Sequence, residues 1–404
     1  MRRDLAFVLI AGALLAIPLG AQRPRGAVIK INNLADATSY AAQVAATPAG
    51  DFIVVWQADH IWVRLFRADG TPKTKQLRVS NSPVAEYGPR LAVGADGAFV
   101  VVWVSGSNIS NLGVFGRRFN ADGTPRGPRF RLNSTRKGFQ TEPAVALGPD
   151  GGFVATWTSE GPYYFDLPNV WARRFDAAGQ PLGSDFRVNM TKFDERESPQ
   201  VAVSASGDFV IGWASWNGEG NFFDVMIRRF ASDGAPLTDE LPTTTESHLS
   251  TNQYEFALGM APDGSFVVLW TDPGAEDTGN IDDDDNVGIL GQRFTADAAP
   301  VGPSFHVDST PRGVQDEPAV AVAADGSFVA LWRSHASQFK PGPASILSRR
   351  FASDGRPLGN EVLVDPVVTS QNLYYPEVAL DRDGQGLAVW TDYGAGIFAR
   401  RLVP

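Results

Sequence analysis

Short apolar runs recur along the chain, each directly after a turn that contains glycine. Two of them are nearly identical, DGSFVVLW at Asp263–Trp270 and DGSFVALW at Asp325–Trp332. The seven runs end at Trp56, Trp103, Trp157, Trp213, Trp270, Trp332 and Trp390. Because a short apolar run bounded by turn residues is typical of a buried strand, the pattern predicts seven equivalent strands.

These runs are apolar on both sides of the predicted strand. In the run that ends at Trp270, Phe266 and Val268 share a face with the tryptophan, and Val267 and Leu269 occupy the other face. A strand with one side in water alternates apolar and polar residues, which these strands do not. We therefore expect each strand to be covered on both faces by neighbouring sheets.

Each apolar run belongs to a longer unit of about 55 residues that contains three further short strands. One strand comes before the run, as at Pro143–Leu147, and a third ends in Arg-Arg-Phe, as at Arg117–Phe119. A glycine turn then leads into a fourth strand, as at Phe130–Asn133. Units of four short strands joined by glycine-bearing turns are typical of β-propeller blades.

The two ends of the chain complement each other in this scheme. The last unit stops after its third strand, at Arg400–Pro404, whereas residues 27–33 match the fourth-strand pattern before the first unit begins. The predicted fold class is therefore all-β, a seven-bladed β-propeller with four antiparallel strands per blade. Its ring is closed by the N-terminal strand (27–33), which completes the last blade and removes an open sheet edge.

The repeated unit resembles one found in secreted and cell-surface bacterial β-propeller proteins. Its pattern is Arg-Arg-Phe, then Asp-Gly, Pro-Leu-Gly and Phe-Arg-Val-Asn, and it covers nearly the whole chain after residue 21. The resemblance implies the repeat fold but specifies no activity. The Asp box of sialidase propellers is absent, because Asp150 precedes Trp157 by seven residues rather than five.

The N-terminal segment has the layout of a secretory signal peptide. Arg2 and Arg3 precede an apolar run over residues 5–17, and residues 19–21 fit a cleavage site. The run is shorter than the roughly 20 residues of a membrane span, although an uncleaved anchor is the alternative. We predict a signal peptide at 1–21, a single propeller domain at 22–404, and a secreted or periplasmic protein. The chain has no Cys, which excludes a lipid-modified cysteine and any disulfide.

Charge narrows the range of partners. The 45 acidic and 35 basic residues give a net charge of −10, and a negative protein repels nucleic acid and anionic lipid. We therefore predict no nucleic-acid partner and no membrane insertion after signal cleavage. The prediction is a monomer with a glycan or protein ligand.

Loop lengths distinguish the two faces of the predicted propeller. The first-to-second and third-to-fourth turns are short, whereas the loops at the other face are long and unequal. Variable loops on a repeated scaffold are where ligands usually bind, and aromatic rings there offer flat apolar area with a polar handle. The predicted ligand-binding residues are Tyr163, Tyr164, Trp216, Phe222, Phe223, Tyr374 and Tyr375. The alternative is that these rings cap the blades as part of the core.

The longest of these loops is strongly acidic. Ca²⁺ takes roughly six to eight oxygen ligands, which clustered carboxylates can supply. The candidate metal ligands are Asp277, Asp282, Asp283, Asp284 and Asp285. Their spacing does not match an EF-hand loop, and the alternative is a solvated acidic loop. We predict weak Ca²⁺ binding there and no other cofactor.

Arginine pairs end the third strand of most units. The first arginine recurs at Arg64, Arg117, Arg173, Arg228, Arg349 and Arg400, and the second at Arg118, Arg174, Arg229, Arg293, Arg350 and Arg401. An anion site is one interpretation. Because the pairs fall near Asp-Gly turns, we expect them instead to form Arg–Asp contacts that hold blade to blade.

The sequence contains few signs of catalysis. The four histidines, His60, His248, His306 and His335, are scattered over different units, and no Gly-x-Ser-x-Gly motif occurs. Carboxylates of the long-loop face could include a general acid and base for glycoside cleavage. These carboxylates are Asp194, Glu195, Glu197, Asp316, Glu317 and Glu377.

The leading hypothesis is a secreted, non-enzymatic propeller that recognises a glycan or protein ligand through its long-loop face, without catalytic residues. The first alternative is a propeller glycoside hydrolase or a related polysaccharide-active enzyme. The second is a structural surface module.

Overall fold

The computed structural model is all-β. It describes residues 22–32, 39–107, 112–160, 167–191, 195–216, 223–244, 253, 255–273, 286–309, 313–336, 343–366 and 372–404. Over these ranges the secondary structure consists of strands and turns, with no helix. It follows that no helix of a length and apolarity suited to crossing a membrane occurs among the residues described.

The strands form four-stranded antiparallel sheets in chain order. The first sheet contains β2 (Tyr40–Ala46), β3 (Phe52–Gln57), β4 (Ile61–Phe66) and β5 (Leu77–Arg78). The second contains β6 (Glu86–Val93), β7 (Phe99–Ser105), β8 (Gly113–Phe119) and β9 (Phe130–Arg131). The third contains β10 (Phe139–Leu147), β11 (Phe153–Glu160), β12 (Asn169–Phe175) and β13 (Phe186–Arg187). The fourth contains β14 (Arg196–Val203), β15 (Phe209–Trp216), β16 (Phe223–Phe230) and β17 (Leu241–Pro242).

The next two units share one eight-stranded sheet. Its strands are β18 (Phe256–Met260), β19 (Phe266–Asp272), β20 (Asn286–Phe294), β21 (Pro300–His306), β22 (Gly313–Val322), β23 (Phe328–His335), β24 (Ala344–Phe351) and β25 (Val362–Leu363). A short parallel pairing of Asn286 and Val287 with Gly313 and Val314 joins the two units. Within each unit the pairing is antiparallel, as the repeat predicts.

The last sheet contains strands from both ends of the chain. Its order is β1 (Arg23–Lys30), β28 (Gly396–Val403), β27 (Gly386–Asp392) and β26 (Leu373–Leu380). The N-terminal strand therefore pairs with the last strand, as predicted, but it covers 23–30 rather than 27–33. Residues beyond the strand still hold the sheet, because Ile397 N–H donates to the Asn32 side chain at 3.0 Å.

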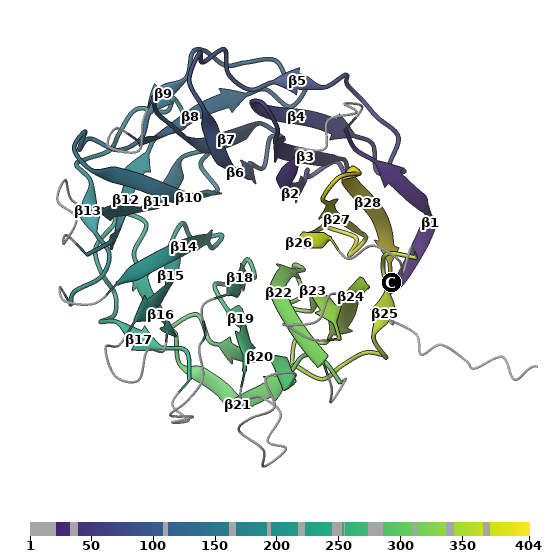
Figure 1. The fold of residues 1–404 in the computed structure, drawn as a ribbon. Helices are drawn as coiled ribbons and strands as arrows, with labels where there is room; N and C mark the ends of the chain where they lie inside the picture. The colour runs from purple at the N-terminus through teal and green to yellow at the C-terminus, as the bar shows by residue number, and fades with distance from the viewer. Residues whose placement is uncertain are drawn as a thin grey trace, which may run out of the picture.

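The sheets are arranged around a common centre (Figure 1). The first strand of each unit lies nearest the middle, and the later strands follow outward. We call these first strands, β2, β6, β10, β14, β18, β22 and β26, the inner strands. Consecutive inner strands contact one another, and β26 contacts β2.

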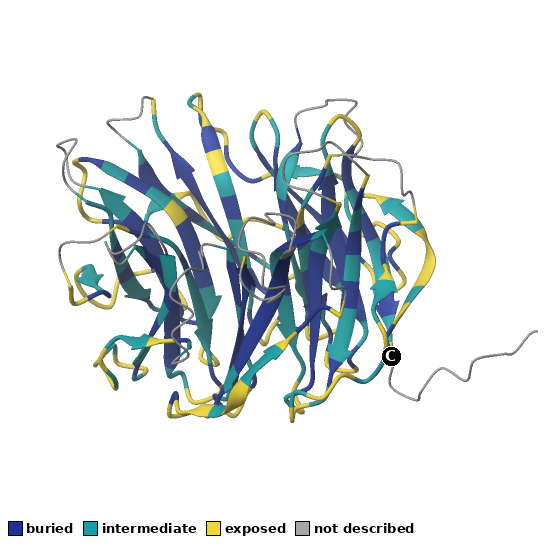
Figure 2. Ribbon diagram, turned by 60° about the horizontal axis from the view of Figure 1, so that its bottom comes forward, coloured by how far each residue is buried: buried dark blue, intermediate teal, exposed yellow. Residues whose placement is uncertain are grey.

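The second strand of each unit forms the core, as its sequence predicts. In β19, Phe266, Val268 and Trp270 pack in one apolar cluster with β15 and β16, whereas Val267 and Leu269 pack in another with β23. Every residue of β19 is buried. Figure 2 shows this burial running along the strands, with exposed residues concentrated in the turns.

The glycine turns before these strands are tight. Gly264 has φ +89°, a conformation that glycine adopts without the steric penalty of a Cβ. The Asp263 carboxylate accepts hydrogen bonds from the Ser265 N–H at 2.9 Å and from its hydroxyl at 2.7 Å. The turn is thus held by its own side chains, which explains the Asp-Gly-Ser sequence.

The arginine pairs do link neighbouring sheets, but mostly through main-chain carbonyls. Arg228 donates to Val188 O of the preceding sheet at 2.7 Å and to Thr238 O of its own at 3.0 Å. Equivalent bonds to the preceding sheet come from Arg64, Arg117, Arg173, Arg349 and Arg400. The expected Arg–Asp contacts between sheets are therefore wrong for most pairs. Arg229 fits the expectation through Asp297 of the next sheet, whereas its contact with Asp208 and that of Arg173 with Asp185 lie within one sheet. A guanidinium has five N–H donors, and strand ends leave carbonyls that need them.

Candidate functional site

The inner strands share an irregularity near their first residues. The register of β2, β6, β10, β14, β22 and β26 shifts there, as in a β-bulge. The bulge residue has φ between +50° and +54° in each case: Ala41, Gly88, Glu142, Ser198, Glu317 and Tyr375. We call these positions the inner bulges. Bulges redirect side chains and are frequent beside active sites.

Glutamates at the inner bulges connect one sheet to the next. Glu142 accepts a hydrogen bond from the Ser198 N–H at 2.7 Å, and Glu317 accepts one from the Tyr375 N–H. Glu255, which directly precedes β18, accepts one from the Glu317 N–H at 2.9 Å. The repeat therefore places carboxylates at the start of the inner strands, and part of their role is to satisfy bulge N–H groups.

The residue after the core tryptophan supports each glutamate. Thr158 donates its hydroxyl to Glu142 at 2.8 Å, and Thr271 donates to Glu255 at 3.3 Å. In β23 the equivalent position is occupied by Arg333, so a charged guanidinium stands where Thr158 and Thr271 have a hydroxyl.

Arg333 holds two adjacent carboxylates. Its Nε donates to Asp316 Oδ1 at 2.7 Å, and a second N–H reaches Asp316 Oδ2. Its Nη1 lies 3.4 Å from Glu317 Oε1, and its Cζ lies 4.4 Å from the centre of the Tyr374 ring. On the other side, His335 Nε2 lies 3.1 Å from Asp316 Oδ2. We call Glu255, Asp316 and Glu317 the carboxylate cluster.

The environment separates the pKa values within the carboxylate cluster. Burial alone would raise the pKa of Asp316, but hydrogen bonds from Arg333 and His335 outweigh it and hold the pKa below its usual value. Burial raises the pKa of Glu317 to about 8; the Arg333 charge opposes this shift, and the Asp316 and Glu255 charges add to it. Burial and the charge of Asp316 also raise the pKa of Glu255. At neutral pH the cluster thus contains an ionised Asp316 beside a protonated Glu317.

Tyrosines lie directly beside this cluster. The ring of Tyr393 lies 5.2 Å from Tyr374, 6.4 Å from Tyr375 and 6.0 Å from Tyr40. Burial, then the nearby Tyr375, raises the pKa of Tyr393. Tyr87 on β6 belongs to the same side of the site, because Gln57 donates to the Tyr40 hydroxyl and accepts a hydrogen bond from the N–H of Gly88, the residue after Tyr87. These five residues form the tyrosine cluster.

The structure brings together only some of the predicted site residues. Tyr374 and Tyr375 lie at the inner bulge of β26, and Asp316 and Glu317 at that of β22. Trp216 and Phe223 face each other across β15 and β16, on a different sheet. The other predicted ligand and metal residues lie outside the described residues: Tyr163, Tyr164, Phe222, Asp277, Asp282, Asp283, Asp284 and Asp285. Where residues are described, no group of three or more His, Cys, Asp or Glu is arranged to hold a metal ion.

Two further acidic positions named from the sequence differ from the cluster. Glu377 accepts a hydrogen bond from Gln43 of the first sheet, and burial raises its pKa. Glu197 has a raised pKa because of burial and then the charge of Glu142. Neither contacts Arg333 in the way that Asp316 and Glu317 do, so neither has the separated pKa values of an acid–base pair.

Sequence reasoning missed Glu255 and Arg333. A signal for Arg333 existed, because the residues after the repeated tryptophans are Gln57, Val104, Thr158, Ala214, Thr271, Arg333 and Thr391. Only one of these is charged. A charged residue at a repeated position next to the core indicates a local partner.

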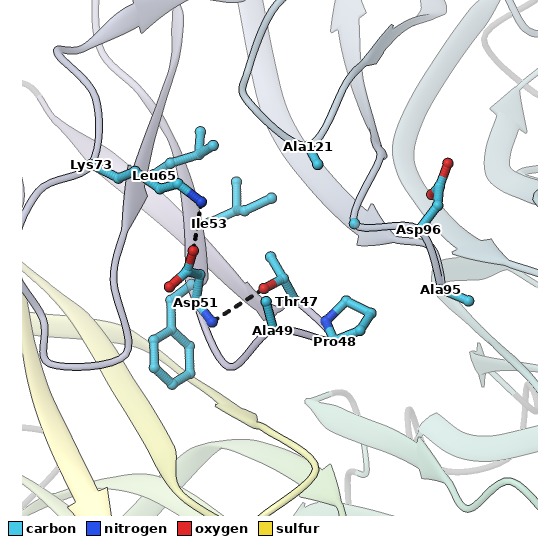
Figure 3. A pocket seen from close by; sticks show the side chains of 12 residues that line it. Thr47, Pro48, Ala49, Asp51, Ile53, Leu65, Lys73, Ala95, Asp96 and Ala121 are labelled. Atoms are coloured by element: carbon cyan, nitrogen blue, oxygen red, sulfur yellow. Dashed lines mark hydrogen bonds and ion pairs between the residues drawn. The ribbon is translucent and has the colours of Figure 1, made fainter.

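The cavities between neighbouring sheets lie at the opposite ends of the inner strands. One of about 160 Å³ is bordered by the turns after β2 and β6 (Figure 3). In it, Lys73 Nζ pairs with Asp51 at 2.6 Å, and the Asp51 N–H donates to the Thr47 hydroxyl at 3.1 Å. Equivalent cavities of about 150 to 230 Å³ recur between other sheets. Because they repeat with the turns, we attribute them to packing between sheets rather than to a site.

Similar structures exist, whereas no protein-family model and no curated protein matches the chain. A protein of unknown function from Dyadobacter fermentans has a TM-score of 0.55 at 12% identity, over 80% of this chain and 95% of that chain. The GH93 α-L-arabinofuranosidase of Fusarium graminearum, in complex with arabinobiose, has a TM-score of 0.52 at 10% identity, over 78% and 92%. The α-L-arabinanase of Penicillium chrysogenum, also complexed with arabinobiose, has a TM-score of 0.51 at 9% identity, over 78% and 92%.

At these identities the likeness shows a propeller-like all-β fold. It also corrects the leading hypothesis from the sequence. A non-enzymatic binding propeller is contradicted, because the similar structures of known activity include propeller glycoside hydrolases. The sequence-based alternative of a glycoside hydrolase agrees better with these structures. The sequence analysis placed it second because acidic loop residues are too common to identify a pair without the contacts of Arg333.

Proposed function

We propose that the protein is a glycoside hydrolase and that cleavage takes place at the carboxylate cluster. The observation that carries the proposal is the pair Asp316 and Glu317, held by one guanidinium with their pKa values shifted in opposite directions. Two carboxyl groups in opposite protonation states are what glycoside hydrolysis requires. The neighbouring folds of the arabinobiose complexes support the same class of reaction.

The two carboxyl groups have different roles in the proposal. Glu317, protonated at neutral pH, gives its proton to the glycosidic oxygen as the bond to the anomeric carbon breaks. Asp316, ionised and fixed by Arg333 and His335, stabilises the positive charge that develops on the sugar ring. A water molecule then supplies the hydroxyl group of the released sugar, and its proton returns to Glu317.

We also propose the finer architecture that places this site. The sheets are seven blades of a closed propeller, with β1 completing the last blade. The pairing of β1 with β28, the contact of β26 with β2 and the seven tryptophan runs support this arrangement. The carboxylate cluster then lies where inner strands begin, on the face of the long loops. A secreted or periplasmic location and membership of the bacterial repeat family remain proposals that rest on the sequence.

The test is hydrolysis of a panel of plant and bacterial polysaccharides by the purified protein, measured as released reducing ends. Glu317→Gln and Asp316→Asn are each expected to lower kcat/KM on the best substrate by about 10²- to 10⁴-fold. Asp354→Asn is the control, because Asp354 is an exposed turn residue in the same unit whose hydrogen bond to Arg356 N–H an amide preserves. Hydrolysis by the control at the wild-type rate is expected.

The pH profile is a second readout. Activity should fall as pH rises through about 8, because Glu317 then loses its proton. Absence of hydrolysis across the panel, or Glu317→Gln and Asp316→Asn variants as active as the wild type, contradicts the proposal.

A further inference from the structure

The tyrosine cluster takes no part in the proton transfers proposed above. Tyr375 and Tyr87 each keep 43% of their surface exposed. They lie on β26 and β6, and the strand β2 contacts both. Tyr40, at the start of β2, therefore lies on the strand between them. The rings form an arc across three neighbouring inner strands.

This arc begins at the carboxylate cluster. The Tyr375 N–H donates to the Glu317 carboxyl group, and Arg333 lies against the Tyr374 ring. The proposed acid is thus one hydrogen bond away from an exposed aromatic residue. A sugar next to the bond that Glu317 protonates would reach the Tyr375 ring.

The rings are held in place before any ligand binds. Tyr375 sits at an inner bulge with φ +53°, and its ring lies 6.3 Å from Tyr374. The Tyr40 hydroxyl accepts a hydrogen bond from Gln57 Nε2 at 2.6 Å. A rigid aromatic side chain gives flat contact area while losing little conformational entropy on binding. Sugar rings present apolar C–H faces that match such area.

The charges around the arc determine which sugars fit. A guanidinium is the usual partner of a carboxylate, but the Arg333 guanidinium is already bound by Asp316 and lies beside Glu317. At the end of the arc, Asp316 and Glu317 lie beside Tyr374 and Tyr375, because the Arg333 guanidinium that binds Asp316 also lies against the Tyr374 ring and Glu317 accepts the Tyr375 N–H. Asp316 is ionised there, so further negative charge next to these tyrosines is unfavourable. A uronate or another acidic sugar would be repelled, whereas an uncharged sugar would not.

We propose that the substrate is a neutral glycan whose sugar ring beside the cleaved bond stacks on Tyr375, with the chain continuing over the arc toward Tyr87. This inference rests on the proposed glycoside hydrolase function, whose substrate class it names.

The experiment uses the full-length Glu317→Gln variant, which is expected to bind glycan without turning it over. Calorimetry compares arabinan, xylan and galactan with carboxymethylated forms of the same three polymers, so that each pair shares a backbone and differs in charge. We expect at least one neutral polymer to bind and its carboxymethylated form to bind at least about tenfold more weakly. Equal or tighter binding of the charged form, or no binding of any neutral polymer, overturns the inference.

Second substitutions in the same background test the tyrosines. Tyr375→Ala is expected to weaken binding by about tenfold and Tyr375→Phe to preserve it, because the aromatic face is what contacts the sugar. Tyr87→Ala, on a separate sheet, should weaken binding of long chains more than that of disaccharides. Leu182→Ala is the control, because Leu182 is an exposed apolar residue, 53% exposed, in a turn of another unit. Unchanged binding in both alanine variants of the tyrosines contradicts the stacking role.

Hydrolysis by the otherwise unmodified protein separates this inference from the proposed function. If a neutral glycan binds through the tyrosines but the wild type does not cleave it, the hydrolase function is contradicted and the binding site stands. If Tyr375→Ala and Tyr87→Ala leave cleavage unchanged, the hydrolase function stands and the stacking site is contradicted.

Discussion

The two ends of the inner strands differ in what the units have in common. At the end of each strand, the turn glycine has φ between +73° and +89° in every unit, and the flanking residues are similar. At the start, the inner bulges repeat the backbone conformation, but their side chains range from none in Gly88 to a carboxylate in Glu317 and a phenol in Tyr375. The backbone repeats at both ends, whereas the chemistry repeats at only one. Function is therefore expected where equivalent positions carry unlike side chains.

Substitution of Arg333 should have the largest effect, because Arg333 holds the carboxylate cluster at the start of the inner strands. Arg333→Met leaves Asp316 and Glu317 without their shared cation, so the pKa of Asp316 should rise. Removing one partner of a buried ion pair destabilises by about 3 to 5 kcal/mol. We expect loss of about 10³-fold or more in kcat/KM together with a lower thermal midpoint. Arg333→Lys should recover part of both, and wild-type kinetics in Arg333→Met contradicts the role of the pair.

Stability should depend on pH through Glu317. Its pKa is about 8 in the folded chain and 4.5 in the reference state, so the unfolded chain loses the proton first as pH rises. Stability should therefore fall between about pH 4.5 and pH 8, by an amount on the order of 3 to 5 kcal/mol for this one group. Urea unfolding at several pH values checks it. Glu317→Gln should flatten the profile over this window, and an unchanged slope in that variant contradicts the assignment.

Substitution of an arginine at the other end should affect stability without affecting hydrolysis. Arg228→Met loses the bonds to Val188 O and Thr238 O and the contact of its guanidinium with the Phe230 ring. Hydrogen bonds to charged groups contribute about 1.5 to 3 kcal/mol each, so a loss of at least about 3 kcal/mol is expected in urea unfolding for the two bonds. The kcat/KM of the folded fraction should equal that of the wild type. Reduced turnover with unchanged stability in Arg228→Met would contradict the assignment of stability to one end of the inner strands and function to the other.

The smallest expected effect concerns one turn. Gly264→Ala places a Cβ at φ +89° and 3.2 Å from the Ala296 Cβ, and it should destabilise the protein by about 1 kcal/mol in urea unfolding. Gly183→Ala is the matched control, because no heavy atom lies within 4 Å of its Cβ position. The control should change stability by less than about 0.5 kcal/mol. Equal effects of the two substitutions would show that the positive φ of Gly264 makes no contribution to stability.

The turns and the core were predictable because they repeat. A strand such as β19 is apolar on both faces wherever it is buried between sheets, and seven copies of one phrase leave little ambiguity. The pairing of β1 with β28 was also predictable, because the last unit lacked a strand and the N-terminus supplied one. The boundaries of β1 were not predictable, because the fourth-strand sequence pattern includes residues beyond the last paired residue of the strand, such as Asn32.

The site was only partly predictable. Tyr374, Tyr375, Asp316 and Glu317 were recognised as residue types in variable positions, but nothing in their spacing showed that a bulge brings them together. The separation of the pKa values depends on Arg333, which comes from another strand. The partners of the arginine pairs were predicted wrongly, because sequence shows side chains and not the carbonyls that strand ends leave available.

The sheet made from both chain ends has a consequence for synthesis. Ile29 pairs with Ala399, and Lys30 with Phe398, so β1 cannot pair in its sheet until β28 has been synthesised. Until then the edge of β28 that β1 covers does not exist, and the residues of β1 have no strand to bond. A polypeptide that stops before β28 therefore cannot form this sheet with β1.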